Sequence, residues 1–93
     1  MPKRVDANQP DIVAALRRAG CSVQSLAMVG HGVPDLLVGR HGDLFLLEVK
    51  DGAKPPSKQK LTQDEIEWIA KWDTTVFIVT STEEALMAVG LMG

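Results

Sequence analysis

The chain has 93 residues, of which 45% are hydrophobic and 24% are charged, and its formal net charge is −2. This length allows one small domain, residues 1–93, and the negative charge argues against a protein that coats DNA by neutralising phosphates. No apolar run is long enough for a membrane span, no signal-peptide pattern begins the chain, and the single Cys21 cannot form an internal disulfide, so we expect a cytoplasmic protein.

The first predicted element is an amphipathic helix that begins near Asn8 and ends at Gly20. Asn8 can cap this helix through its side chain, and Pro10 suits the first turn. The positions expected to face inward are Ile12, Val13, Leu16 and Ala19. A strand within residues 21–28 follows, in which Cys21 is expected to be a small core residue. Gly30 and Gly32 then permit tight turns or a close approach to a phosphate.

The centre of the chain consists of two short apolar runs, and each carries an acid. Asp35 precedes the run at residues 36–38, and Glu48 lies within the run at residues 43–50. A protein interior does not tolerate an unpaired charge, so these acids require an explanation. If the two strands pair through a loop at residues 39–42, Asp35 lies beside Glu48. Lys50 then shares the face of Glu48, because alternate side chains of a strand point the same way.

Two neighbouring carboxylates repel each other unless a cation lies between them. Hard oxygen ligands of this kind suit Mg2+ or Mn2+, which bind one or two carboxylates together with waters and substrate phosphates. The pattern therefore predicts metal-assisted phosphoryl chemistry. The alternative is structural, because an Asp after Pro is commonly a turn residue, and a Glu and a Lys two positions apart are commonly a solvated pair.

The segment that leaves the second of these strands is rich in lysine. Lys54, Lys58 and Lys60 lie close to two prolines, and we predict that these lysines contact phosphate groups. Such contacts position a duplex but carry no sequence information. A loop that is merely solvated is the alternative.

The rest of the chain predicts a helix, a strand and a second helix. Thr62 caps the first of these helices, and Glu65 completes a capping box. The residues of this helix expected to face the core are Ile66, Ile69, Ala70, Trp68 and Trp72. Residues 75–79 are expected to be the most clearly buried strand. The last helix starts at Ser81 or Thr82, and its expected inner residues are Ala85, Leu86 and Val89.

The predicted order of elements is α-β-β-β-α-β-α in one α/β domain. The third strand connects to the fourth through a helix, and this connection predicts a central mixed β-sheet flanked by helices.

The pair Pro34-Asp35, followed by Glu48-Val49-Lys50, resembles the PD-(D/E)XK nuclease motif. Residues 30–37 with residues 47–50 look like its small VRR-NUC branch, common in phages and prophages, and the likeness extends over nearly the whole chain. The resemblance implies a restriction-endonuclease-like core and a Mg2+- or Mn2+-dependent DNA endonuclease that leaves 5′-phosphate and 3′-hydroxyl ends. It also implies phage or prophage DNA processing in a bacterial host cell, on branched or junction DNA rather than on a specific sequence, as in Holliday junction resolvase-like enzymes.

The resemblance also implies roles for individual residues. Asp35, Glu48 and the main-chain carbonyl of Val49 would hold the metal. Lys50 would orient or deprotonate the attacking water and balance the negative transition state.

Other positions are expected to support this site. The family's acidic residue near the start of the first helix is usually a Glu, which this chain lacks there, so Asp11 or Asp6 is expected to replace it. The remaining supporting residues are expected to be Gln9, Gln63 and Glu65.

The expected partners are DNA and a second copy of the chain, because cutting two strands requires two sites held in a fixed relation. Several apolar residues near the C-terminus would face the second copy or close the domain's own core, namely Leu86, Met87, Val89, Leu91 and Met92. Two alternatives belong to other classes. One is a non-catalytic DNA-binding or assembly module on a nuclease scaffold, and the other is a phage interaction protein whose charged cluster is structural.

Overall fold

The computed structural model describes residues 5–91 of the chain. Local sequence signals determine where most of its helices and strands begin and end. Gly20, with a φ of +95°, follows the end of the first helix, and Ser81 caps the last helix by accepting a hydrogen bond from the Glu84 N–H. The elements in chain order are α1 (Gln9–Arg18), β1 (Ser22–Ser25), β2 (Leu36–Arg40), β3 (Asp43–Val49), the 3-10 helix η1 (Pro56–Lys58), α2 (Gln63–Lys71), β4 (Val76–Val79) and α3 (Thr82–Ala88). The predicted order is confirmed, with η1 added.

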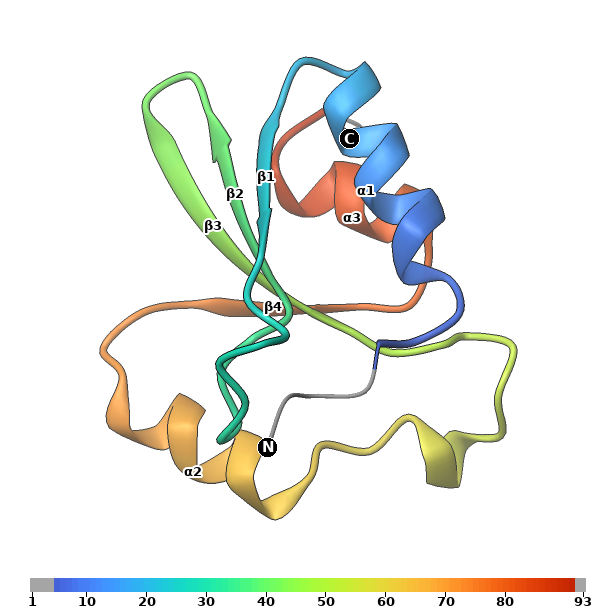
Figure 1. Ribbon diagram of the computed structural model, residues 1–93, viewed down its shortest axis with the longest axis vertical. Helices are drawn as coiled ribbons and strands as arrows, with labels where there is room; N and C mark the ends of the chain where they lie inside the picture. Colours follow the sequence, from blue (N-terminus) through green and yellow to red (C-terminus); the bar gives the residue numbers. More distant parts are fainter. Residues whose placement is uncertain (1–4, 92–93) are drawn as a thin grey trace.

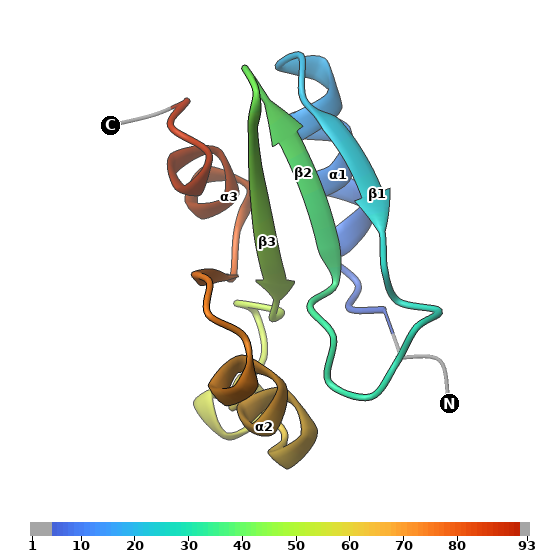
Figure 2. The ribbon, with the colours of Figure 1, turned by 90° about the vertical axis from the view of Figure 1, so that its left-hand side faces the viewer.

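The strands form one mixed sheet in the order β1-β2-β3-β4. The first three strands are antiparallel neighbours, as Figure 2 shows, and β4 pairs with β3 in parallel. The long connection between β3 and β4, with η1 and α2, provides the crossover that a parallel pair requires. The expected α/β class and the mixed sheet flanked by helices are confirmed. Among residues 5–91, no helix has the length and apolar character needed to cross a membrane.

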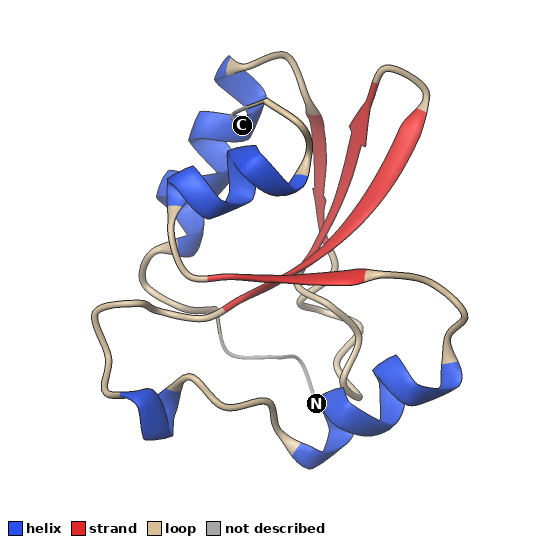
Figure 3. Cartoon of the chain, turned by 180° about the vertical axis from the view of Figure 1, so that it is seen from behind, coloured by secondary structure: helices blue, strands red, loops and turns tan. Residues whose placement is uncertain are grey.

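The hydrophobic core lies between the sheet and the pair of helices α1 and α3, which pack against each other (Figure 1). The buried apolar residues of this core are Ile12, Leu16, Cys21, Leu36, Val38, Leu47, Val49, Val79, Ala85 and Val89. Helix α2 lies apart from this pair, as the view from behind in Figure 3 shows clearly. The core therefore depends on two of the three α-helices.

The central hairpin is tighter than the sequence analysis predicted. The expected loop at residues 39–42 is wrong at its first two positions, because Arg40 pairs with Asp43 and β2 continues through Arg40. His41 and Gly42 have φ values of 49° and 84°, which suit a two-residue hairpin turn that follows the twist of its strands. The strand predicted within residues 21–28 is shorter than expected and contains Ser22–Ser25.

The prediction that Asn8 caps α1 through its side chain is wrong. Asn8 occupies the position before the helix, but its side chain makes no capping hydrogen bond. Its amide nitrogen instead donates to the main-chain oxygens of Lys50 and Thr80, each at 3.1 Å. Asn8 therefore ties the start of α1 to the chain immediately after β3 and β4.

The predicted burial of α2 and β4 is largely wrong. The one buried residue of α2 is Glu65, whereas Ile66 is 47% exposed and Ala70 is exposed, and the predicted inward residues Ile69 and Trp68 are only half-buried. Trp72 is 55% exposed and stacks on Trp68, with ring centroids 4.8 Å apart, instead of entering the core. Strand β4 is an edge strand, so its solvent side has no neighbour within residues 5–91, and only Val79 is buried.

The C-terminal apolar residues mostly close the domain's own core. Val89 is buried, and Leu86 and Leu91 pack against the core cluster. Met87 is exposed, and Met92 lies outside the described residues. Ala19, at the end of α1, is exposed rather than inward-facing.

Candidate functional site

The structure brings Asp35 and Glu48 together where β2 begins and β3 ends. Leu36 pairs with Leu47, so one further step in this antiparallel register sets Asp35 across from Glu48. The Asp35 Oδ2 atom accepts a hydrogen bond of 2.7 Å from the main-chain N–H of Val49. Both acids are 1% exposed, so the pairing of the strands places two carboxylates in the protein interior.

Lys50 extends this group of charges. It follows β3, and its Nζ lies 3.4 Å from Glu48 Oε2 and 2.8 Å from Glu65 Oε1. The side chains of all three residues are at least nine-tenths buried. Three carboxylates and one ammonium group thus form a buried cluster, Asp35, Glu48, Lys50 and Glu65, which we call the acidic cluster. Its formal charge is −2, which an added cation would offset.

Glu65 reaches the acidic cluster from the first turn of α2. The predicted capping box is present, because the Thr62 N–H donates to Glu65 Oε1 at 2.8 Å and the Glu65 N–H donates to Thr62 Oγ1 at 3.2 Å. Gly32 lies directly against this turn, since a Cβ atom at Gly32 would collide with the main-chain oxygen of Asp64. The sequence analysis expected a turn or a close approach to a phosphate at this glycine; the structure shows a close approach to the backbone of α2.

The three polar candidates near the start of α1 have different environments. Gln9 is 4% exposed, and its side-chain oxygen has no hydrogen-bond partner among residues 5–91. Asp11 is exposed on the helix, and Asp6 is half-buried and lies 3.4 Å from the Nζ of Lys54. The expectation that Asp11 or Asp6 supplies a further metal ligand stays a prediction, although the outer side of α1 keeps Asp11 in solvent. Of the three, Gln9 is the buried one.

The predicted DNA contacts lie on the connection that leaves the acidic cluster. Lys54, Lys58 and Lys60 are all exposed, and Lys58 is the last residue of η1. Gln63, expected to support the site, is also exposed, and its amide lies 3.4 Å from the carboxylate of Glu67. The structure therefore brings Glu65, but not Gln63, to the buried charges.

The donor atoms of the acidic cluster fit a hard divalent cation. Asp35 and Glu48 supply carboxylate oxygens, and the N–H and C=O of a strand residue point to the same side, so the Val49 carbonyl points toward the edge of β3 that Asp35 occupies. Within residues 5–91, no group of three or more His, Cys, Asp or Glu side chains is arranged to hold a metal ion. A bound ion would therefore take two carboxylates together with main-chain and water oxygens, as Mg2+ commonly does.

The chain was compared with known proteins to identify the family that it resembles. A solved structure described as a VRR_NUC domain matches with a TM-score of 0.57 and 27% sequence identity, over 90% of this chain and 96% of that chain. This match confirms the VRR-NUC resemblance. No family model and no curated protein matches the chain. The similarity to a VRR_NUC domain indicates a nuclease of the PD-(D/E)XK type, a class that generally uses divalent metals.

Two contacts of this VRR-NUC-like site were absent from the sequence analysis. Asn8 holds the main chain beside Lys50, and Gly32 admits the first turn of α2. The sequence analysis expected the glycine at position 32 to allow a turn or a close approach to a phosphate, and it did not predict the contact with α2. No local signal distinguished a capping Asn8 from one that joins two strand ends.

Proposed function

We propose that the protein is a metal-dependent DNA endonuclease that hydrolyses phosphodiester bonds. The observation that carries this proposal is the burial of Asp35 and Glu48 on neighbouring strands, with the Lys50 ammonium 3.4 Å from Glu48. Such a charged interior costs folding free energy, and metal-assisted catalysis accounts for its presence. The similarity to a VRR_NUC domain supports the same reaction class.

The roles of the residues follow from their chemistry. Asp35, Glu48 and the Val49 carbonyl would hold Mg2+ or Mn2+, and the bound ion would supply an activated water and charge stabilisation at the phosphate. Lys50 places a positive charge beside Glu48, where its ammonium group can orient the attacking water and stabilise the developing negative charge. The buried Gln9 oxygen is suited to accept a hydrogen bond from a water in the site.

The exposed lysines on the connection after β3 are proposed to hold the DNA backbone. Changing Lys54, Lys58 and Lys60 together to Gln is expected to weaken DNA binding and to flatten its dependence on salt, because each phosphate contact releases counterions. Cleavage at saturating DNA should change far less. A fluorescence anisotropy titration over a range of salt concentrations measures this slope, and a slope equal to that of the unmodified protein would refute the role.

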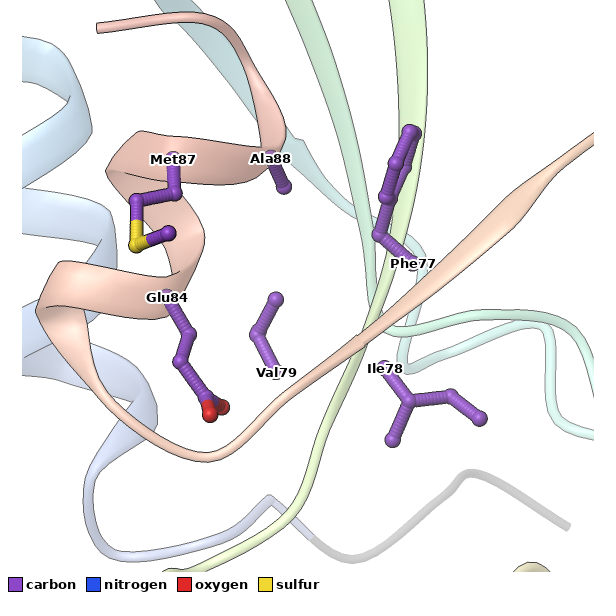
Figure 4. Close-up of a pocket in the computed structure, with 6 residues that line it drawn as sticks. All are labelled: Phe77, Ile78, Val79, Glu84, Met87 and Ala88. Atoms are coloured by element: carbon purple, nitrogen blue, oxygen red, sulfur yellow. The ribbon is translucent and has the colours of Figure 1, made fainter. Parts of the chain in front are cut away.

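We further propose a homodimer that acts on branched or junction DNA in phage or prophage DNA processing in a bacterial cell. Figure 4 shows a mostly apolar hollow at the edge of the sheet, lined by residues of β4 and α3 together with the Glu84 carboxylate, and the side chains of Ile78 and Met87 are about half exposed. A second copy would cover this hollow and bring a second site. Light scattering should give about twice the 10.1 kDa chain mass, and Met87→Glu should lower it. A monomeric protein that resolves four-way junctions would contradict the dimer.

The reaction itself is tested by nicking of labelled junctions, forks and plain duplexes. Cleavage is expected with Mg2+ or Mn2+, none is expected in EDTA, and the branched substrates should be cut faster than the duplex. DNA binding without cleavage in either metal would instead favour a non-catalytic module on a nuclease scaffold.

A further inference from the structure

Helix α2 is unusual in what it buries. Its buried residue is the acid Glu65, which is 2% exposed, while Ile66 on the same helix is about half exposed. Burying a carboxylate costs folding free energy unless it is paired, whereas burying Ile66 would stabilise the protein. The helix therefore lies in an orientation that fully buries a charge, while the apolar Trp68 and Ile69 on the same side of the helix are only half-buried.

One oxygen of Glu65 links the end of β3 to the first turn of α2. Glu65 Oε1 accepts from the Lys50 ammonium at 2.8 Å and from the Thr62 N–H at 2.8 Å. The second contact is part of the capping box, so the position of the carboxylate is fixed by the first turn of α2. Gly32 packs against the same turn and fixes it relative to the strand that follows Asp35. The carboxylate is therefore held in a defined place beside Lys50.

We propose that Glu65 is a positioning residue that shares the ammonium of Lys50 with Glu48, so that Lys50 offsets less of the Glu48 charge that attracts a divalent cation. Lys50 lies between two carboxylates and is closer to Glu65, at 2.8 Å, than to Glu48, at 3.4 Å. An ammonium paired tightly with Glu48 would compete with a metal ion for the same oxygen. This inference rests on the proposed metal-dependent function and assigns a separate task to a residue outside the predicted ligands.

The charges of the acidic cluster give a quantitative expectation. The unmodified cluster has a formal charge of −2, Glu65→Gln makes it −1, and Lys50→Gln makes it −3. The double variant Lys50→Gln/Glu65→Gln returns the formal charge to −2. Cation affinity should follow these charges, because the groups lie close together in a poorly solvated place.

The direct experiment is calorimetric titration of Mn2+ into the full chain without DNA. Glu65→Gln is expected to weaken Mn2+ binding by about tenfold or more, the scale set by one unit charge near a partly screened site. Gln at this position can still complete the capping box, so the cap is preserved while the charge is lost. The matched control is Asp64→Asn, which removes an exposed charge from the same turn and should leave Mn2+ affinity nearly unchanged.

The double variant separates a charge effect from a structural one. Lys50→Gln/Glu65→Gln should recover most of the Mn2+ affinity lost in Glu65→Gln, which a merely distorted helix would not do. If Glu65→Gln fails to fold by circular dichroism, Glu65→Asp keeps the charge and should bind Mn2+ more tightly than a Glu65→Ala variant.

Equal Mn2+ affinity in Glu65→Gln and the unmodified protein, or no recovery in the double variant, would overturn the proposal. An unmodified protein that binds no Mn2+ would overturn it as well. Failure of the nuclease function is a different result, because Mn2+ binding that depends on Glu65 without any DNA cleavage would leave this inference intact.

Discussion

Two helical regions of the molecule meet the rest of the chain in opposite ways. Helices α1 and α3 pack apolar side chains such as Leu16 and Ala85, both fully buried, against the inner face of the sheet. Helix α2 instead contributes the buried carboxylate of Glu65 and leaves Ile66 and Trp72 exposed. The difference indicates that the first region provides stability, whereas the second region is placed by an ion pair and a close backbone contact to complete a charged site.

A change in the apolar region should have the largest effect on stability. Leu47→Ala removes a fully buried side chain of β3 and is expected to cost about 2–5 kcal/mol in the free energy of unfolding. The matched control is Leu44→Ala on the same strand, where the side chain is 72% exposed and the cost should stay within about 0.5 kcal/mol. Urea unfolding measures both values. Equal costs would mean that β3 does not pack as described.

A change at the contact of α2 should cost less through the lost contact itself than Leu47→Ala costs. Gly32→Ala places a Cβ atom into the backbone of Asp64, and Gly42→Ala meets no atom within 4 Å, although both glycines have positive φ, +81° and +84°. Backbone strain of about 1–2 kcal/mol is common to both variants. The additional loss in Gly32→Ala, about 1–3 kcal/mol by the usual scale of overpacking, should therefore report the collision with α2.

The same pair of variants also distinguishes stability from activity. Gly32→Ala should reduce cleavage because it displaces the turn that carries Glu65, while Gly42→Ala should retain it. Similar cleavage rates in the two variants, measured well below their melting temperatures, would show that catalysis does not depend on the position of α2.

The smallest effect on stability is expected where α1 meets the strand ends. Asn8→Ala removes two hydrogen bonds, to the main-chain oxygens of Lys50 and Thr80, and should cost about 1–2 kcal/mol. Asn8→Asp is the informative companion, because it keeps the size of the side chain but cannot donate to a carbonyl oxygen. If Asn8→Asp were as stable as the unmodified protein in thermal unfolding, the two hydrogen bonds would not contribute to the stability of the protein.

The sequence allowed the central hairpin to be predicted because its signals are local. The alternation around Glu48 and Lys50 identifies one face of β3, and the short separation of Asp35 from that strand leaves few ways to pair them. Thr62 and Glu65 define the start of α2 for the same reason, since a capping box involves residues three positions apart.

The remaining features depend on tertiary contacts that a local pattern does not contain. The apolar run of β4 fits a central strand as well as an edge strand, and its exposure follows from its place at the end of the sheet order. Helical spacing identified an apolar face on α2, but it did not show that the Lys50–Glu65 contact makes Glu65 the most buried residue of that helix. Asn is a residue type that commonly caps helices, yet two carbonyl oxygens of distant residues accept the hydrogen bonds of the Asn8 side chain.

The most direct test of the central claim is metal-dependent plasmid nicking by purified Asp35→Asn, with Asp43→Asn as the control. Asp35 is buried at the acidic cluster, whereas Asp43 is exposed at the hairpin turn. We predict that Asp35→Asn remains folded and loses cleavage in Mg2+ and Mn2+ by about a hundredfold or more, because it removes a charge that binds the catalytic ion. Asp43→Asn should cleave like the unmodified protein. Undiminished nicking by a folded Asp35→Asn protein would contradict the account.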